Sequence, residues 1–326
     1  MKPFAVVVPV GPWDAEMRRL RDLVESLTYY ESRLGWLVLV DDAAPPRRPS
    51  FGDGLPAHVQ VITLQNPRNG RGYAYLGGLA VGVLSAFAWL WRHADPSFTL
   101  KLDTDSLVIG PFASAVAERL RAAPAAGLIG ALGKTCNRAC PDFGRDVESR
   151  SPIIGLLEDW RARPAPDTPG PAGEPPSPDA VEREAVGRIR RHIEAAERHG
   201  YRTLQYCQGG GYAVSPAMLT RMAASGAFDD MLGWAYLPVG EDVIVGMLAR
   251  SVGLEVVDAS SDGEPFGVQS RGLAFSPEDL VGRGYAIVHS VRTDAALDEA
   301  HIRRLFASRR TVPAVAAAPR GGRSIP

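Results

Sequence analysis

The N-terminal third of the chain alternates short apolar runs with longer segments of helical periodicity, and this alternation strongly restricts the fold. Residues 4–10 and 36–40 are apolar enough to be buried strands. Between them, hydrophobic side chains recur at helical spacing, at Met17, Leu20, Leu23, Val24 and Leu27. A helix that joins two strands in this way favours a right-handed crossover with parallel strands. The sequence therefore predicts an α/β fold, Rossmann-like, with a mostly parallel central sheet flanked by helices.

The same alternation continues up to the first acidic motif. A third strand is expected at residues 58–64, after a proline-rich turn, and a helix at residues 72–93. The apolar part of that helix, residues 76–91, falls short of the roughly 20 residues that span a membrane, so we expect a core helix. The next strand, residues 98–102, delivers Asp103 to the carboxyl edge of the sheet, where open α/β sheets bind ligands.

We expect one large domain whose parts differ in composition. Residues 1–110 form a first half, and residues 205–292 a second half that also contains strands. The region between them, 111–204, is variable in character and includes a Pro-rich flexible loop at 164–179. A helix over 180–199 follows that loop. A C-terminal helix is expected within 293–312, and the tail 313–326 reads as disordered.

Composition excludes several classes of function. The chain has 326 residues, of which 45% are hydrophobic, and a formal charge of −1, which describes a soluble globular protein. So balanced a charge gives no reason to expect nucleic acid as a partner. Three cysteines without metal-binding spacing favour a reducing, cytoplasmic location. The N-terminus lacks the features of a signal peptide, and no transmembrane segment is expected.

Two carboxylates one residue apart, Asp103 and Asp105, end the fourth expected strand. Side chains at positions i and i+2 of a strand point the same way, so both acids can face one ligand. Paired hard oxygen ligands suit a divalent cation that carries a bound phosphate. The alternative is a polar exit from the strand without a function.

Three further segments have the composition of a phosphate or nucleotide site. Asp41 and Asp42 end the second strand, where a carboxylate can accept hydrogen bonds from a ribose or a base, or can belong to a solvated turn. The segment 66–74 is basic and glycine-rich and opens a helix, which suits a pyrophosphate but is common at helix starts. Three glycines at 209–211 precede an expected short strand and would let a ligand lie against the backbone, although a bulge would explain one of them.

The second half of the chain adds candidates for catalysis and for metal binding. Glu241 and Asp242 begin an apolar helix, where one of them could act as a general base or simply cap the helix. Trp234 and Tyr236, just before, offer stacking surfaces for a sugar. His289 follows a strand-like run, and although a lone histidine is more often structural, this one could complete a metal shell.

The order of these motifs resembles that of the GT-A glycosyltransferases. The portion from Val6 to Asp105 looks like the large inverting family that includes many bacterial synthases, with its Val-Val-Pro strand, paired acids and an Asn shortly before Gly-aromatic-Ala. The portion from Gly209 to Val245 is more similar to Fringe-type transferases, which have a Gly-Gly-Gly-Tyr strand and a Glu-Asp-Val helix start. Residues 110–204 are not covered by the resemblance, and no acceptor loop has a recognisable form.

The resemblance implies a metal-dependent glycosyltransferase that takes a sugar from a nucleoside-diphosphate sugar, with a UDP-sugar as the expected donor, and passes it to a hydroxyl acceptor: a glycan, a lipid or a small molecule. Residues 1–110 would bind the nucleotide sugar and 205–292 the donor and acceptor. Asp242 would be the catalytic base, with Glu241 as the alternate, in an inverting single displacement. The metal, Mn²⁺ or Mg²⁺, would be bound by Asp103, Asp105 and His289. The donor would contact Pro9, Val10, Asp41, Asp42, Asn69, Arg71, Asp103, Thr104, Gly209, Gly210, Gly211 and Arg292, and the acceptor Trp234 and Tyr236.

Two other functions stay open from the sequence. Residues 102–107 also look like the nucleophile motif of haloacid-dehalogenase-type phosphatases, in which Asp103 would attack phosphorus and Asp105 would assist the leaving group. That motif normally opens its domain, whereas three expected strands precede it here. The other alternative is a non-catalytic protein that binds a nucleotide sugar with the same fold.

Overall fold

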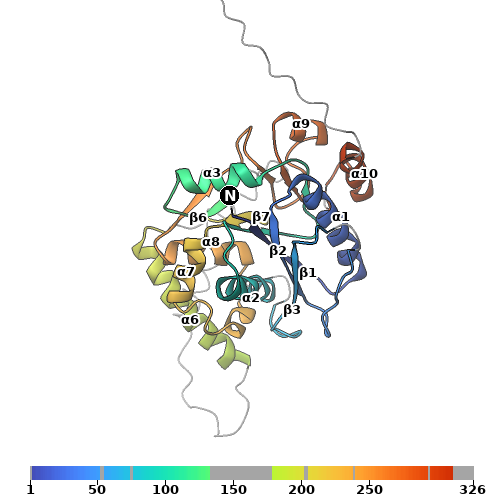
Figure 1. The fold of residues 1–326 in the computed structure, drawn as a ribbon. Coiled ribbons are helices and arrows are strands. Elements are labelled where there is room, and N and C mark those ends of the chain that lie inside the picture. Colours follow the sequence, from blue (N-terminus) through green and yellow to red (C-terminus); the bar gives the residue numbers. More distant parts are fainter. Residues whose placement is uncertain are drawn as a thin grey trace, which may run out of the picture.

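The structure, a computed structural model, describes residues 2–51, 55–73, 76–132, 178–201, 205–237, 239–292 and 294–310. Their centre is a seven-stranded sheet with strand order β3-β2-β1-β4-β7-β6-β8, in which β7 alone runs antiparallel to its neighbours. Helices cover both faces of this sheet (Figure 1). The expected α/β fold with a mostly parallel central sheet is therefore confirmed.

The strands of the large sheet are β1 (Phe4–Val10), β2 (Leu34–Asp41), β3 (Gln60–Gln65), β4 (Thr99–Leu102), β6 (Ala126–Leu132), β7 (Cys207–Val214) and β8 (Glu255–Asp258). A three-stranded sheet of order β5-β10-β9 lies beyond β4 in the chain and consists of β5 (Leu107–Val108), β9 (Phe266–Val268) and β10 (Ile287–His289). The sequence pattern did not predict this second sheet as a unit, because strands of two or three residues have no readable periodicity.

The helices are α1 (Asp14–Tyr30), α2 (Gly77–His93), α3 (Ala113–Ala122), α6 (Pro178–Arg198), α7 (Pro216–Ala224), η2 (Leu232–Tyr236, a 3₁₀ helix), α8 (Glu241–Ser251), α9 (Pro277–Gly282) and α10 (Glu299–Arg310). The helix expected from residue 72 begins only at Gly77, and α10 begins only at Glu299, within the expected 293–312. Most of the expected Pro-rich loop and the tail from 313 lie outside the described residues. Among the described residues, no helix is both long and apolar enough to cross a bilayer.

Strand β1 is apolar throughout because each of its faces packs against a different core. Ala5 and Val7 belong to a cluster with residues of α2, α6, α7 and α8. Phe4, Val6 and Val8 belong to another cluster, with residues of α1 and α3. Both faces of a parallel sheet are usually covered in this way, which explains the unbroken hydrophobic run at the N-terminus.

The chain changes direction across the sheet between β1 and β4. From β1 it builds outwards through β2 to β3, and then returns through α2 to place β4 on the other side of β1. Such a switch point leaves a crevice at the carboxyl ends of the two strands, and open α/β sheets bind ligands there. Asp103 follows the end of β4, so the fold delivers it to this position.

Helix α10 holds the loop after β4 in place against α1. Arg19 of α1 makes a two-pronged ion pair with Glu299, with both nitrogen–oxygen distances at 2.7 Å. Arg303 pairs with Asp22 of α1 at 2.6 Å and also donates to the carbonyl oxygen of Thr104 at 3.3 Å. The C-terminal helix is therefore connected to α1 and to the loop that follows β4.

Candidate functional site

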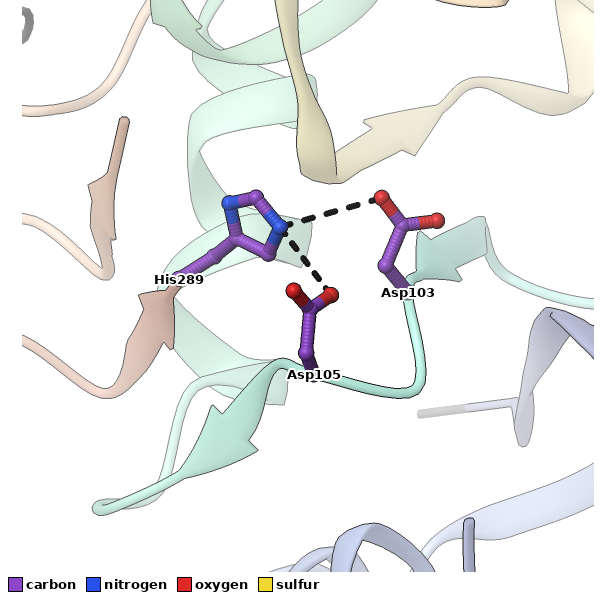
Figure 2. A group of neighbouring side chains, drawn as sticks. All are labelled: Asp103, Asp105 and His289. Atoms are coloured by element: carbon purple, nitrogen blue, oxygen red, sulfur yellow. Dashed lines mark ion pairs between the residues drawn. The ribbon is translucent and has the colours of Figure 1, made fainter. Parts of the chain in front are cut away.

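Asp103 and Asp105 lie in a tight turn between β4 and β5. Strand β4 ends at Leu102, and the amide of Ser106 donates to the carbonyl of Asp103 at 3.1 Å, which closes a four-residue turn. The expectation that both acids share one face of a strand was therefore wrong about the local structure. The turn nevertheless directs both carboxylates to the same side, toward His289 at the end of β10 (Figure 2).

The side chains of Asp103, Asp105 and His289 converge. Nε2 of His289 lies 3.2 Å from Oδ1 of Asp105 and 3.8 Å from Oδ2 of Asp103, and the three ligand atoms all lie within 4.8 Å of one another. Figure 2 shows one ring nitrogen of the imidazole facing both carboxylates. The structure thus brings together the three residues that the sequence resemblance had assigned to a metal.

Each of the three side chains is held by a protein group on the side that faces away from the others. Oδ1 of Asp103 accepts from Nζ of Lys101 at 2.7 Å, and Oδ2 of Asp105 accepts from Oγ of Ser290 at 2.7 Å. Nδ1 of His289 lies 2.7 Å from the carbonyl oxygen of Gln269. Because a carbonyl can only accept, Nδ1 carries a proton, so Nε2 is the ring nitrogen that faces the two acids and that would bind a cation in exchange for its own proton. Such outer partners are typical of metal-binding histidines and carboxylates.

The pair of Asp105 and His289 is polarised even without a metal ion. Burial alone would raise the pKa of Asp105, but His289, Ser290 and Arg292 outweigh it, so this pKa lies well below its ordinary value. Burial alone would lower the pKa of His289, but the nearby Asp105 outweighs it, so this pKa is raised. A cation bound by Nε2 would replace the proton that this arrangement attracts.

The donor set fits a divalent cation. Two carboxylate oxygens and one imidazole nitrogen converge, and all three are orientated by neighbouring groups. Carboxylate oxygens suit Mg²⁺ and Mn²⁺, while a nitrogen ligand shifts the preference toward a transition metal such as Mn²⁺. The types of ligand atom and the hydrogen-bonded groups behind them are therefore those expected of a metal site.

The sequence suggested that the three consecutive glycines precede a short strand. In the structure they lie within β7. A Cβ atom on Gly210 would come within 2.0 Å of Cγ of His289, so this glycine is needed for the close approach of the imidazole to the strand. Its carbonyl oxygen accepts from the amide of Asp103 at 3.2 Å and from Oγ of Ser106 at 2.6 Å. At Gly210, the close neighbour of the backbone is therefore a side chain of the protein.

Glu241 and Asp242 occupy the first turn of α8 but do not cap it, since Gly240 is the N-cap residue and no side chain bonds there. Glu241 is buried, accepts from the hydroxyl of Tyr212, and lies 3.4 Å from Nζ of Lys101. Asp242 is partly exposed and accepts from the amides of Val243, at 2.9 Å, and Gly209. The helix start therefore connects to the acidic turn through Lys101.

Burial raises the pKa values of both acids at the start of α8. For Glu241 it prevails over the opposing effects of Lys101 and Tyr212, with a further increase from Asp242, and brings the pKa to about 7. For Asp242 burial prevails over the backbone amides and Lys101, so the pKa is raised as well. A carboxylate with a raised pKa accepts a proton more readily, which is the property of a general base.

Asp41 and Asp42, the expected uridine contacts, take part in ion pairs. Oδ1 of Asp41, a buried residue, lies 2.7 Å from a guanidinium nitrogen of Arg47, which also donates to carbonyl oxygens of residues 11–13. Asp42 is paired with Arg68, whose Nε lies 2.8 Å from Oδ1. Contact of either acid with a nucleoside would add to these bonds, so the assignment of both stays a prediction.

The basic loop after β3 packs against η2. Asn69 and Arg71 are exposed, and Nε of Arg71 donates to the carbonyl of Arg68 at 3.1 Å. The amide of Tyr73 donates to the carbonyl of Ala235 at 2.9 Å. This contact places the expected nucleotide loop beside the segment of the expected acceptor residues.

The remaining donor candidates lie around the acidic turn and at the end of β1. Thr104 is buried and its hydroxyl donates to Glu16, while the half-exposed Arg292 has its Nε 3.9 Å from Oδ2 of Asp105. Pro9 and Val10 are the last residues of β1, and Val10 is buried in the core. Their roles toward a donor stay predictions.

Trp234 faces a cavity of about 520 Å³ between α6 and the segment 225–234, and the residues that line it include none of the candidate metal ligands. The indole is buried, its Nε1 donates to the carbonyl of Ala227 at 3.2 Å, and its ring contacts that of His192. Tyr236 is partly buried in η2. An indole fixed in this way serves the core, and the role of both aromatics toward an acceptor stays a prediction.

Sequence reasoning missed several residues that organise the site: Lys101, Glu16, Ser290 and Tyr212 through their side chains, and Gln269 through its backbone carbonyl. A signal existed for Lys101, because it lies two residues before Asp103 and points to the same side of β4. Ser290 is adjacent to His289 and could have been noticed. Gln269 and Glu16 approach the site through tertiary structure alone, and nothing in the local sequence marks them.

No protein-family model matches the chain, and no curated protein sequence matches it. The chain does match solved structures. The bifunctional glycosyltransferase WbbM has 10% identity and a TM-score of 0.48 over 95% of this chain, which spans half the length of WbbM. A glucosyl-3-phosphoglycerate synthase from Mycobacterium tuberculosis, solved with Mn²⁺ and UDP, has 15% identity and a TM-score of 0.37 over 86% of this chain and 75% of its own. An active-site mutant of LgtC has 11% identity and a TM-score of 0.45 over 95% of this chain and 98% of its own.

All three are GT-A glycosyltransferases. The likeness of residues 209–245 to Fringe-type transferases stays a prediction.

Proposed function

We propose that this chain is a metal-dependent glycosyltransferase that moves a sugar from a nucleoside-diphosphate sugar, with UDP as the first nucleotide to test, to a hydroxyl group of an acceptor. The observation that carries the proposal is the convergence of Asp103, Asp105 and His289 at the carboxyl edge of the sheet. Each ligand is orientated by a separate protein group, as expected of a site that is preorganised for a cation.

The charge around these ligands suits a diphosphate. Mn²⁺ or Mg²⁺ held by Asp103, Asp105 and His289 would supply positive charge against the departing nucleoside diphosphate. Arg292 is half exposed beside Asp105 and Glu16, which it approaches only to 3.9 and 3.7 Å, so its guanidinium group can also meet a phosphate oxygen from solvent. The turn that carries both aspartates donates a hydrogen bond to β7 and accepts one from α10, which reduces the cost of ordering it when a donor binds.

Asp242 is the residue we assign as general base. It is partly exposed, and its raised pKa favours uptake of a proton from the acceptor hydroxyl. The acceptor oxygen then bonds to the anomeric carbon while the bond from that carbon to the diphosphate breaks, which inverts the configuration. Glu241 is less suited, because its carboxylate is buried and already bonded to Tyr212 and close to Lys101.

The test combines binding with turnover. Calorimetry should detect UDP binding in the presence of Mn²⁺ and a much weaker signal in EDTA, and Asp105→Asn should abolish the difference. A panel of UDP-sugars, assayed for released UDP with and without simple hydroxyl acceptors, should then identify a donor. Absence of binding for every nucleoside diphosphate and nucleotide sugar, with either metal, would refute the proposal.

The same experiment separates the two alternatives. A non-catalytic protein would bind a nucleotide sugar with Mn²⁺ and release no UDP under any condition. A phosphatase would release phosphate from a simple phosphomonoester such as p-nitrophenyl phosphate, which the proposed transferase should leave intact.

A further inference from the structure

Lys101 is a buried lysine whose ammonium group contacts three acceptors of the protein itself. Its side chain has no exposed surface, and Nζ lies 2.7 Å from Oδ1 of Asp103 and 3.4 Å from Oε2 of Glu241. Nζ also donates to the carbonyl of Gly209. An ammonium group has three protons, so these contacts leave no donor for a ligand. Lys101 must therefore act through the residues that it contacts.

The contact with Asp103 determines what that aspartate offers to a cation. Oδ1 is paired with Lys101, while Oδ2 faces Nε2 of His289 at 3.8 Å. Asp103 therefore presents a single oxygen to the candidate metal position. In addition, the charge of Lys101 opposes a cation at this position, and the effect is strong because a buried charge is poorly screened.

Asp105 differs from Asp103 in this respect. Its outer oxygen, Oδ2, is held by the neutral hydroxyl of Ser290 at 2.7 Å. Arg292 approaches the same oxygen only to 3.9 Å and is half exposed, so solvent screens its charge. The two aspartates thus have comparable geometry but different electrostatic surroundings, with the fixed positive charge on the side of Asp103.

We propose that Lys101 is a positioning residue that makes cation binding depend on the diphosphate of the donor. The inference rests on the proposed function and specifies how its metal site is regulated. Lys101, which Asp103 shares with Glu241, offsets part of the charge of Asp103, so the ligand set alone undercompensates a divalent cation. The diphosphate supplies the missing negative charge, and cation and nucleotide therefore stabilise each other in the site.

The contact with Glu241 extends this role to the start of α8. Glu241 is adjacent to Asp242, the assigned base, and its carboxylate lies between Lys101 and the hydroxyl of Tyr212. One ammonium group thus connects a candidate metal ligand with the residue next to the base. Its loss would alter both parts of the site, so the test needs variants that separate charge from packing.

The experiment measures Mn²⁺ binding by calorimetry in wild type, Lys101→Met and Lys101→Arg, each with and without UDP. In wild type, UDP should tighten Mn²⁺ binding. In Lys101→Met, Mn²⁺ alone should bind at least about tenfold more tightly than in wild type, and the gain from UDP should shrink. Lys101→Arg keeps the charge and should retain the wild-type dependence on UDP. Ser290→Ala removes the neutral contact to the other aspartate and should not tighten Mn²⁺ binding.

Circular dichroism and thermal unfolding verify that each variant is folded. Should Lys101→Met fail to fold, Lys101→Met combined with Glu241→Gln removes one charge of each sign and takes its place in the comparison. Equal Mn²⁺ affinity in wild type and in the folded methionine variant overturns the inference, and so does wild-type Mn²⁺ binding that UDP leaves unchanged. Failure of wild type to bind both Mn²⁺ and UDP refutes the proposed function itself, and the inference falls with it.

Discussion

Nε2 of His289 lies 3.2 Å from Oδ1 of Asp105, although the two residues come from different parts of the fold. Asp105 belongs to the turn that follows β4 of the large sheet, and His289 ends β10 of the small one. A cation at this position would therefore bond to both sheets at once. Its effect should extend to the stability of the whole fold, because binding to the native state alone shifts the unfolding equilibrium.

Replacement of His289 by glutamine should abolish this stabilisation by metal. Mn²⁺ at about 100 times its dissociation constant should stabilise wild type by about 2.7 kcal/mol, and His289→Gln should lose most of that effect because one ligand nitrogen is missing. Thermal unfolding with Mn²⁺ and with EDTA measures the difference. His192→Gln, a histidine that lines the separate cavity, is the matched control and should respond to Mn²⁺ as wild type does. An unchanged response in His289→Gln would contradict the assignment of the ligand.

A methyl group on Gly210 should damage the site far more than one on Gly209. The added atom would lie 2.0 Å from Cγ of His289 in the first variant, but 3.4 Å from Oδ2 of Asp242 in the second, which is an ordinary contact. We expect Gly210→Ala to cost about 1–3 kcal/mol and to weaken Mn²⁺ binding, since His289 or β7 must shift. Urea unfolding and calorimetry on both alanine variants measure the two effects. Equal behaviour of the two variants would show that the imidazole does not need this glycine.

Asp242→Asn should reduce sugar transfer and leave nucleotide binding intact. Removal of a general base usually lowers the rate by about 10²- to 10⁴-fold, so a decrease in kcat of that size is expected with the donor that the UDP-sugar panel identifies. Calorimetric affinity for UDP with Mn²⁺ should stay near the wild-type value. Asp229→Asn, a substitution of an exposed carboxylate beside the separate cavity, serves as the control. A kcat equal to that of wild type would remove Asp242 from the role of base.

The pair of Asp41 and Arg47 should make stability depend on pH on the acid side. Burial alone would raise the pKa of Asp41, but hydrogen bonds from Arg47 and from the amide of Ala43 outweigh it, so the pKa lies below its ordinary value. The stabilisation is therefore complete above about pH 4, near the pKa of an unfolded aspartate, and is lost as the pH falls through the lower, folded value.

Urea midpoints between about pH 2.5 and pH 6 measure this effect, and Asp41→Asn should flatten the acid part of the profile. The exposed pair of Lys2 and Asp95 provides the control, because exposed ion pairs contribute little and Asp95→Asn should leave the profile as in wild type. An equally steep loss of stability in Asp41→Asn would attribute the acid sensitivity to other carboxylates.

The fold was more accessible from the sequence than the arrangement within the site. The strands β1, β2 and β4 and helix α1 follow from hydrophobic periodicity, because each has to bury at least one face against a core. The start of α2 was set too early, because the loop before it packs against η2 and is held there by backbone bonds to residues 235 and 237. Such contacts across the structure leave no local pattern.

Within the site, the spacing of Asp103 and Asp105 indicated that they face one ligand, but the reason given for it, their place along a strand, differs from the structure. The acids converge because of a turn and not because of strand alternation. Lys101, on the same strand, was passed over because a basic residue in an apolar run looks incidental until its acidic partners are placed around it. Gly210 was interpreted as space for a ligand, whereas it makes space for His289.

The separation along the chain between the two parts of the candidate metal centre has a consequence for how the protein folds. Asp105 and Ser290, which hydrogen-bond across the centre, are 185 residues apart, and β10 is the last strand of the described chain. Contacts between such distant segments form late, since closing a long loop costs entropy that only a nearly complete structure repays. We therefore do not expect a metal ion to nucleate folding at this site. Uptake of Mn²⁺ during refolding should instead coincide with the last folding step, so the rate of Mn²⁺ binding should measure the rate of that step.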